Sequence, residues 1–354
     1  MAHRIHIAVL DTDVPCQTVY AQRGLYSSQF RTLLQSAAKR VNANAELQLQ
    51  NGPLAVHISA FDAVGGSLPP LECLRSTPRS PADSKAGGPF SPIDAILITG
   101  SASSAYDLDP WIRELESFIQ IVHTEFPLIK MFGSCFGHQI IAQALLSGSH
   151  EKNGAEVGVH PTFHVEHSAL GFELGIQAIT LEQSFTAHFP MLAQHTSPMS
   201  PFRIQLIHGD IVVPTPAAKA AALVSGQGNI PLPPGWMNIG RSAVCDIQGL
   251  YYPGRILTYQ GHFEFDVWSN RALCIEFGRR GNWPTESVQR YIEQIERTLV
   301  PGAEDDDDAK CAAEVVLLFF AGEDNSDVVR KSSGLGLGLG SLVAPNGMLT
   351  PPLE

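Results

Sequence analysis

Residues 128–139 read LIKMFGSCFGHQ, and this stretch decides the fold class. Its first part, Leu128–Phe132, is a short and largely apolar run that predicts a buried strand. The segment Gly133–Gly137 then places a cysteine between two glycines, and a predicted helix follows at once to about Leu146. A strand that turns sharply into a helix at a nucleophilic residue is a nucleophile elbow, with sulfur here in place of the serine oxygen. The pattern therefore predicts an α/β fold with a reactive thiol at the turn.

The residues of this elbow suit the chemistry of a nucleophilic thiolate. A tight turn excludes side chains, so Gly133 and Gly137 avoid clashes that larger residues would make. Cys135 lies at the start of the next helix, whose dipole favours the thiolate, and the N–H of Phe136 points to where an oxyanion would form. The alternative is a buried structural cysteine between packing glycines, but the preceding strand and the following helix favour the elbow.

The elements before the elbow alternate between strand and helix. This rhythm is typical of a parallel sheet that is covered by helices on both faces. A Pro/Gly/Ser-rich stretch at 65–92 interrupts it and predicts a long surface loop. The predicted strands are Ile5–Leu10, Leu54–Phe61, Ile93–Thr99 and Leu128–Phe132, and the predicted helices cover about residues 30–41, 111–124 and 136–146.

The second half of the chain is richer in predicted strands. We expect one domain over residues 1–322, with an acidic linker at 303–308, a closing helix at 309–321 and a flexible tail at 323–354. A further helix is expected at about 286–299. The predicted strands are Ala155–Phe163, Ile204–His208, Ala221–Val224, Ala243–Asp246 and Arg255–Gln260.

Composition narrows the class of protein. The chain has 354 residues, of which 44% are hydrophobic, and a net charge of −12, which argues against nucleic acid as the main partner. The cysteines form no CxxC pair, and the spacing of His160, His164 and His167 suits no common zinc site. The start is too polar for a secretory signal, and no apolar run approaches the roughly 20 residues that span a bilayer. We expect a cytoplasmic protein with no metal, no cofactor and no membrane contact.

A second motif, QGHFEF at 260–265, follows the predicted strand Arg255–Gln260. His262 and Glu264 are two positions apart, so their side chains project to the same side of an extended segment. The carboxylate can hold one imidazole nitrogen while the other nitrogen faces a nucleophile. Alone, this pair is also compatible with a solvated loop; together with the elbow it indicates a cysteine–histidine–glutamate arrangement.

The two motifs resemble the signatures of the class I glutamine amidotransferase-like family. Three further segments agree in order with that family: LITGSASSAYDLDPWI at 97–112, NGAEVGVH at 153–160 and LIHGDIV at 206–212. The resemblance covers roughly residues 5–320. It implies a flavodoxin-like, mostly parallel central sheet with helices on both faces and an active site at the carboxyl ends of the strands.

The resemblance also implies roles for individual residues. Cys135 would be the nucleophile, His262 the general base and acid, and Glu264 the residue that orients the imidazole. Backbone amides would form the oxyanion hole, and a pocket beside it would hold the γ-glutamyl group. The residues implied are Gly100, Ser101 and Phe136 for the oxyanion hole, Gln139 for the pocket, and Tyr106 and His208 for the pocket wall.

Several positions depart from the family pattern. Phe263 replaces the usual proline after the histidine, Ser134 replaces an aliphatic residue before the nucleophile, and Ala155 stands where tryptophan is usual. These changes bear on the substrate more than on the chemistry.

The resemblance implies a stand-alone enzyme that cleaves glutamine or a γ-glutamyl amide through a thioester, like members described as γ-glutamyl peptidases. No Walker A sequence or synthetase module is visible, so ammonia transfer would need a synthetase partner in trans. Two alternatives remain open. The same residues could form a tailoring hydrolase for a larger ester, amide or carbon–carbon substrate in a biosynthetic pathway, or the chain could be a non-catalytic interaction protein.

Overall fold

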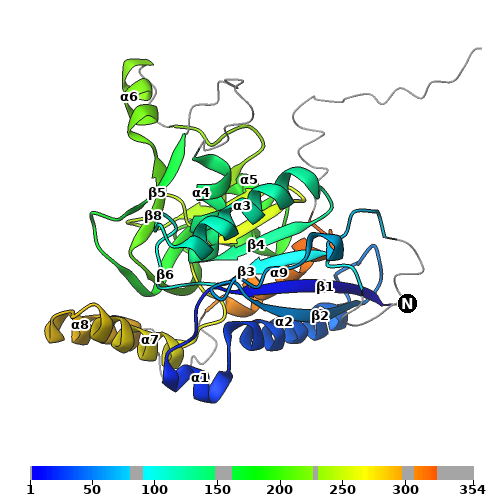
Figure 1. Cartoon of the computed structure of the whole chain (residues 1–354), viewed down its shortest axis with the longest axis horizontal. Helices are drawn as coiled ribbons and strands as arrows, with labels where there is room; N and C mark the ends of the chain where they lie inside the picture. The colour runs from blue at the N-terminus through cyan, green and yellow to red at the C-terminus, as the bar shows by residue number, and fades with distance from the viewer. Residues whose placement is uncertain (1, 80–90, 148–161, 226–229, 297–306, 325–354) are drawn as a thin grey trace, which may run out of the picture.

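A mostly parallel sheet forms the centre of the molecule (Figure 1). The computed structural model describes residues 2–79, 91–147, 162–225, 230–296 and 307–324. Within these residues the central sheet has seven strands in the order β2-β1-β3-β4-β12-β11-β9; the first five pair in parallel and the last two antiparallel. Their bounds are β1 (His3–Asp11), β2 (Leu54–Asp62), β3 (Ala95–Ile98), β4 (Lys130–Ser134), β9 (Met237–Asn238), β11 (Leu250–Tyr252) and β12 (Ile256–Tyr259). The predicted flavodoxin-like fold class is confirmed.

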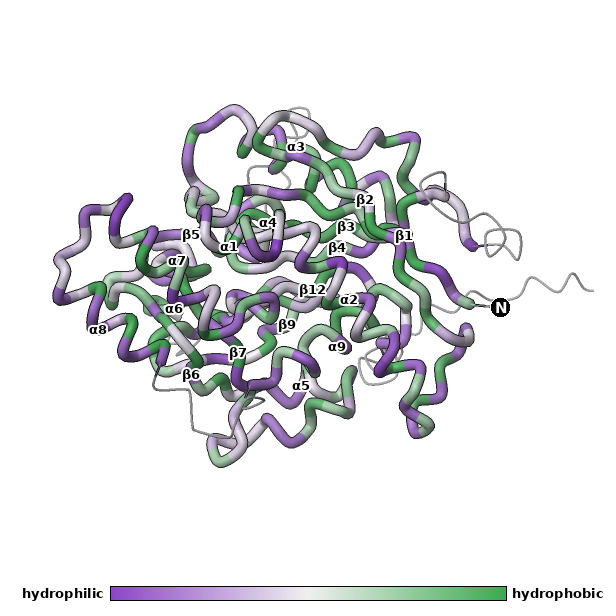
Figure 2. Tube along the Cα trace, turned by 90° about the horizontal axis from the view of Figure 1, so that it is seen from below, coloured by the Kyte–Doolittle hydropathy of each residue, from purple (hydrophilic) through white to green (hydrophobic). Residues whose placement is uncertain are grey.

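Side chains of β1 alternate between two hydrophobic cores, one on each face of the sheet. Ile5, Ile7 and Val9 belong to one core, and Ala8 and Leu10 belong to the other. In Figure 2 hydrophobic colour follows these central strands. The first core is covered by α2 (Tyr26–Ala43) and α9 (Ala309–Ala321), and the second by α3 (Pro110–Glu125) and α4 (Phe136–Leu146).

The covering helices begin where the sequence supplies start signals. Pro110 occupies the first turn of α3, where its missing N–H leaves no hydrogen bond unmade. The carboxylate of Asp11, at the end of β1, accepts the backbone N–H of Ser27 in the first turn of α2 at 2.8 Å. Asp266 and Ser269 form a reciprocal capping box at the start of α7 (Val267–Arg280).

Two smaller sheets and several helices lie outside the central sheet within the described residues. β6 (Glu173–Leu181) and β7 (Phe202–His208) form an antiparallel pair that is extended by β10 (Gly240–Arg241), and β5 (Phe163–His167) pairs with β8 (Asp210–Pro214). The remaining helices are α1 (Gln17–Arg23), α5 (Gln183–Thr186), α6 (Pro216–Ser225), α8 (Thr285–Glu296) and the 3₁₀ turns η1 (Leu71–Cys73) and η2 (Pro190–Thr196).

Two predicted strands are wrong. Ala221–Val224 lies in helix α6, because the run PAAKAAALVS is rich in alanine and begins with proline, which is common at a helix start. The four residues of the predicted strand do not include this proline. Ala243–Asp246 is a turn rather than a strand; there Ser242 N–H donates to the carbonyl oxygen of Cys245 at 2.9 Å. Helices α1 and α7 were not predicted, and most of the predicted strand Ala155–Phe163 lies outside the described residues.

Asp308, the last residue of the predicted acidic linker, is anchored to β7. The backbone N–H and the carboxylate of Asp308 both pair with the backbone of Arg203 in β7, each at 2.7 Å. Glu323 and Asp324, the first two residues of the predicted tail, lie within the described residues, and Asp324 is buried. Residues 303–306 and 325–354 of the predicted linker and tail lie outside the described residues. Within the described part of the chain, every helix is too short or too polar to cross a bilayer.

Candidate active site

Cys135 occupies a strained turn between β4 and α4. Its backbone has φ 50° and ψ −105°, a conformation that L-residues rarely adopt and that is typical of nucleophile elbows. The turn is tied to the neighbouring strand, since the N–H of Cys135 donates to the carbonyl oxygen of Tyr259 at 2.9 Å. The side chain is buried but lines two cavities, so it is presented to a ligand rather than packed away.

The two glycines of the elbow are required by close backbone contacts. A side-chain carbon at Gly133 would lie 2.3 Å from the carbonyl oxygen of Gly137. A side-chain carbon at Gly137 would lie 2.3 Å from the carbonyl oxygen of Ile98 in β3. Both distances are far inside van der Waals contact, so the sequence-based reason for these glycines is the one that the structure gives.

His262 and Glu264 form a buried pair on the loop after β12. His262 Nδ1 lies 2.7 Å from Glu264 Oε1, and both side chains are nearly excluded from solvent. The imidazole is stacked on Phe265, with ring centroids 4.1 Å apart. The backbone N–H of His262 donates to the carbonyl oxygen of Gln205 in β7 at 2.8 Å. Ring, backbone and carboxylate contacts together leave Nε2 as the nitrogen available to a reacting group.

Cys135 and His262 meet across a small cavity. A side-chain carbon placed at Gly100 would lie 3.0 Å from His262 Cε1 and 3.6 Å from Cys135 Cβ, so both side chains approach the same point. The cavity between them has a volume of about 20 Å³. The three residues expected to act together are therefore brought together, although they come from separate parts of the chain.

The electrostatics of this group favour a charged imidazole. Burial lowers the pKa of His262, but the negative charges of Glu264 and Cys135 oppose it, and the pKa is raised overall to about 10. A protonated ring beside the sulfur stabilises a thiolate, as does the N-terminus of α4. The arrangement therefore suits nucleophilic attack by sulfur followed by proton donation from Nε2.

The loop after β3 is fixed by the end of β1. Thr12 Oγ1 donates to the carbonyl oxygen of Gly100 at 3.0 Å, and the carboxylate of Asp13 accepts the N–H of Ala102 at 2.9 Å. Gly100 and Ser101 line the small cavity together with Cys135. These two positions are thus where the oxyanion loop was expected.

Phe136 can contribute to an oxyanion hole only through its backbone N–H. Its ring is fully buried and packs on Trp111. Its N–H is the first of helix α4, and the first-turn amides of a helix have no acceptor within the helix. This amide next to the sulfur is the second expected element of the oxyanion hole.

A second cavity, of about 460 Å³, opens on the other side of Cys135. Gln139 lies at its floor, where its Nε2 donates to the carbonyl oxygen of Asp210 at 3.0 Å. Tyr106 and His208 also line this cavity, as the sequence suggested. Phe172, Phe277 and Trp283 add an aromatic wall that sequence reasoning missed, because these residues carry no motif and come from the segment before β6, from α7 and from the segment between α7 and α8.

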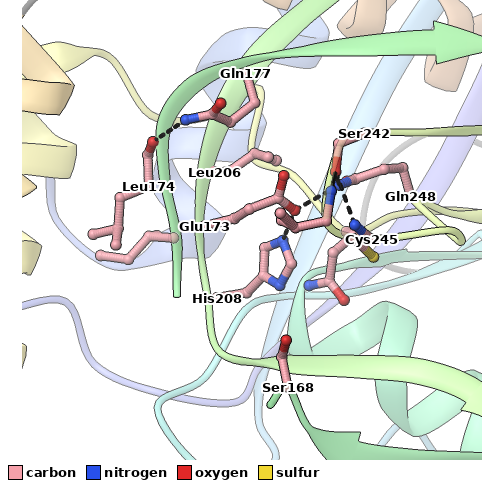
Figure 3. A network of polar contacts seen from close by, with 12 residues as sticks. Ser168, Glu173, Leu174, Gln177, Leu206, His208, Ser242, Cys245 and Gln248 are labelled. Atoms are coloured by element: carbon pink, nitrogen blue, oxygen red, sulfur yellow. Dashed lines mark hydrogen bonds and ion pairs between the residues drawn. The ribbon is translucent and has the colours of Figure 1, made fainter. Parts of the chain in front are cut away.

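His208 is held by a buried polar network (Figure 3). Its Nε2 lies 3.1 Å from Glu173 Oε2, and its Nδ1 lies 3.1 Å from the carbonyl oxygen of Asp210. Glu173 in turn accepts a hydrogen bond from Gln248 Nε2 at 2.9 Å, and Gln248 also donates to Ser242. The network fixes the orientation of the His208 ring in the cavity wall.

Two further residues within the motifs also touch the reacting group. Gln260 Nε2 lies 3.6 Å from Cys135 Sγ, within the range of a hydrogen bond to sulfur. Ser134 Oγ donates to Glu264 Oε1 at 3.2 Å. Both residues stand inside the two signature motifs, but their side-chain directions depend on how β4 and β12 pair.

The histidine run considered for metal binding does not gather ligands. His164 pairs with Glu166, and His167 contacts Asp210 at 3.1 Å on the cavity rim. His160 lies outside the described residues. Across the described ranges, no group of three or more His, Cys, Asp or Glu side chains could hold a metal ion.

The sequence is similar to known amidotransferase-like proteins. It is 27% identical over 262 residues to a provisionally named glutamine amidotransferase-like protein of Schizosaccharomyces pombe, covering 74% of this chain and 80% of that protein. It is 30% identical over 175 residues to a provisionally named glutamine amidotransferase of Saccharomyces cerevisiae, covering 48% of this chain and 53% of that protein. It is 22% identical over 183 residues to the glutamine amidotransferase-like protein chyE of Penicillium rubens, covering 52% of this chain and 60% of that protein. No protein-family model matches the sequence.

Solved structures of glutamine amidotransferases resemble the chain at a distance. The enzyme from Methylobacillus flagellatus has a TM-score of 0.49 at 15% identity, with 91% of this chain and 93% of that chain covered. The enzyme from Thermotoga maritima has a TM-score of 0.46 at 15% identity, with 90% of this chain and 96% of that chain covered. By its sequence relatives, its parallel sheet and its cysteine elbow, the chain is similar to class I glutamine amidotransferase-like proteins.

Proposed function

We propose that the protein is a stand-alone cysteine amidohydrolase or amidotransferase that cleaves glutamine or a γ-glutamyl amide through a thioester. The single observation that carries this is the convergence of three side chains. Cys135 on a strained elbow and His262 share one small cavity, and His262 Nδ1 lies 2.7 Å from Glu264. A fixed nucleophile, a base and its orienting carboxylate are the parts that acyl transfer requires.

The first half-reaction forms the thioester. The Cys135 thiolate attacks the amide carbon, and the carbonyl oxygen becomes an oxyanion near the Phe136 amide and the Gly100–Ser101 loop. His262 Nε2 then gives its proton to the amide nitrogen as the C–N bond breaks. Ammonia or an amine leaves, and the acyl group remains on sulfur.

The second half-reaction releases the acid. Neutral His262 takes a proton from water, whose oxygen attacks the thioester carbon. The C–S bond breaks, the carboxylic acid leaves and loses its proton to the solvent, and the thiolate–imidazolium pair is restored. In an amidotransferase the ammonia released earlier would pass to an acceptor held by a synthetase partner. Glu264 keeps Nδ1 protonated throughout, so that Nε2 always faces the reacting atoms.

The two cavities suggest which part of the substrate lies where. The leaving nitrogen must be near His262, where the space is about 20 Å³, enough for a molecule of the size of water or ammonia. The acyl group then extends past Gln139 into the cavity of about 460 Å³. This asymmetry favours a primary amide, such as glutamine, over an amide with a bulky amine.

A thioester trap tests the proposal. The wild-type protein is incubated with L-glutamine or with γ-glutamyl dipeptides, and the mass of the intact protein is measured after rapid acid quenching. We expect a glutamyl adduct on Cys135 and release of glutamate. Cys135→Ala should lower turnover by at least about 10³-fold with an unchanged circular dichroism spectrum. The matched control Cys73→Ala removes an exposed cysteine and should keep full activity. Equal turnover by wild type and Cys135→Ala rejects the proposal.

A tailoring hydrolase with a larger acyl group is the second candidate. It is favoured by the volume of about 460 Å³, which lies in the range of cavities for drug-sized ligands, and by the aromatic wall of Phe172, Phe277 and Trp283. Trp283→Ala should then raise KM for large aromatic amides or esters while leaving glutamine turnover intact. If glutamine is hydrolysed well, and large acyl compounds are not hydrolysed at all, the second candidate is excluded. A protein whose Cys135 reacts with neither class would be the non-catalytic scaffold.

A further inference from the structure

We propose that Ser134 is a positioning residue that orients the Glu264 carboxylate and stabilises its charged form. The reacting group then has four members, because Ser134 joins Cys135, His262 and Glu264. The inference rests on the function proposed above. It begins from the hydrogen bond of Ser134 Oγ to Glu264 Oε1, at 3.2 Å inside the protein. Ser134 is fully buried, so water cannot replace this donor.

The hydrogen bond from Ser134 goes to the carboxylate oxygen that also contacts His262. Glu264 Oε1 is also the atom that contacts His262 Nδ1, at 2.7 Å. Glu264 Oε2 has no hydrogen-bond partner within the described residues. One oxygen therefore receives both donors, and the hydroxyl and the imidazole together define the plane and the direction of the carboxylate.

The hydroxyl proton has a second acceptor to choose from, the carbonyl oxygen of Gly261 at 3.4 Å. The carboxylate is nearer and charged, and hydrogen bonds to ionised acceptors are shorter and stronger than those to neutral ones. The Gly261 contact keeps the hydroxyl in place next to the loop that carries His262. We infer that the proton points to Glu264.

The position of Ser134 in the chain couples the two halves of the site. Ser134 is the last residue of β4, is paired with Tyr259 of β12, and immediately precedes Cys135. One backbone turn thus presents the sulfur to the cavity and the hydroxyl to the carboxylate behind the imidazole. A shift of the elbow would move the nucleophile and the support of its base together.

Removal of the hydroxyl would leave a buried carboxylate with a single donor. The charged form of Glu264 would then be less stable, and the imidazolium that depends on it would lose its proton at lower pH. The titratable groups that face this pair are Cys135 from the elbow, Tyr26 from α2 and Asp13 after β1, which lines the same small cavity. None of these is altered by a change at Ser134.

The test uses the full-length protein and the variants Ser134→Ala, Ser134→Thr and Ser134→Val. Threonine keeps the hydroxyl, whereas valine has nearly the same shape without it. The rate of Cys135 alkylation by iodoacetate, an anion that the neighbouring imidazolium attracts, is measured from pH 5 to 11 by mass spectrometry of the Cys135 peptide. This reaction needs no knowledge of the substrate. In parallel, kcat and KM are measured with L-glutamine.

We expect the alkylation rate of the alanine and valine variants to fall at a pH about one unit lower than that of the wild type on the alkaline side of the profile. Their kcat should be about tenfold lower, with KM unchanged. Threonine should keep the wild-type limb. The inference is overturned if alanine keeps the wild-type limb, if only the melting temperature falls, or if threonine and valine behave alike. Should the two β-branched variants fail to fold, the alanine profile decides. If wild type hydrolyses no amide, the proposed function fails, and the alkylation profiles still decide the role of Ser134.

Discussion

His262 Nδ1 lies 2.7 Å from Glu264 Oε1, and Cε1 of the same imidazole approaches the point beside Gly100 that Cys135 Cβ also approaches. The carboxylate and the sulfur therefore both act on one ring. Since the ring is buried and stacked on Phe265, it has little freedom to turn away from either. This relationship makes the protonation of one histidine the property that controls the site.

Glu264→Gln should move the alkaline limb of Cys135 reactivity to lower pH. The pKa of His262 is lowered by burial and raised by Glu264 and Cys135, with a net rise to about 10. Glutamine has the same shape but no charge, so it removes a raising contribution, and the imidazolium loses its proton at lower pH. The pH dependence of Cys135 alkylation by iodoacetate, whose negative charge the imidazolium attracts, measures the shift. Glu276→Gln is the control, because that carboxylate is paired with Arg279 and Arg280 on the surface and should leave the profile unchanged. An unaltered or upward-shifted limb in Glu264→Gln would contradict the assigned pairing.

Cys135→Gly should be more stable than Cys135→Ala, opposite to the usual order. At φ 50° and ψ −105° an alanine side chain is strained, and glycine relieves a strain of about 1–3 kcal/mol against its own entropic cost of about 0.5–1 kcal/mol. The control pair is Cys16→Gly and Cys16→Ala, where φ −53° and ψ 151° are ordinary and alanine should be the more stable. Urea unfolding of the four variants measures the difference. The same order at both positions would show that the elbow is unstrained.

Gly137→Ala should destabilise the protein although the position is helical. Within a helix, alanine is normally favoured over glycine by about 0.5–1 kcal/mol. Here the added carbon would lie 2.3 Å from the carbonyl oxygen of Ile98, and backbone cannot move aside cheaply. We expect a loss of about 1–3 kcal/mol or more in the free energy of unfolding.

Gly278→Ala in α7 is the matched control for this substitution. There the added carbon would meet the tip of the Val288 side chain, which can adjust by rotation. Its loss in a thermal melt should be clearly smaller than that of Gly137→Ala. A stabilised Gly137→Ala protein would mean that α4 and β3 do not pack as closely as described.

Asp324→Ala should weaken the fold far from the site. Asp324 Oδ2 accepts hydrogen bonds from Tyr251 Oη at 2.7 Å and from the Gly254 N–H at 3.0 Å, and Oδ1 lies 3.5 Å from Lys130 Nζ. Since Lys130 is largely buried, loss of its partner leaves an uncompensated charge, and we expect a cost of about 3–5 kcal/mol. Urea unfolding measures it. Glu323→Ala, which loses only a contact to the Gln50 N–H, should cost less than about 1 kcal/mol. Equal losses would argue against a specific Asp324 anchor.

Elements with a strong local pattern could be predicted from the sequence. The apolar runs of β1 and β3 and the i, i+3, i+4 spacing of α2 and α3 gave strands and helices close to their observed bounds. Where the pattern was short or ambiguous it misled: Ala221–Val224 is apolar enough for a strand, but the proline and alanines around it form a helix. Strand β6 and helix α7 have mixed faces, so their periodicity was weak, whereas the more evenly buried β7 was predicted as Ile204–His208.

The sequence by itself determined the chemistry of the candidate site: a cysteine between two glycines after an apolar strand, and a histidine two positions before a glutamate. Those patterns are local, because a tight turn and an extended segment fix side-chain directions over a few residues. Only the tertiary structure decided that Cys135 and His262 reach one point, that Ser134 turns to Glu264, and that the aromatic side chains of three separate segments line the larger cavity. These contacts depend on the parallel pairing of β4 with β12 and on the packing of helices across the sheet, which join residues that are distant in the chain.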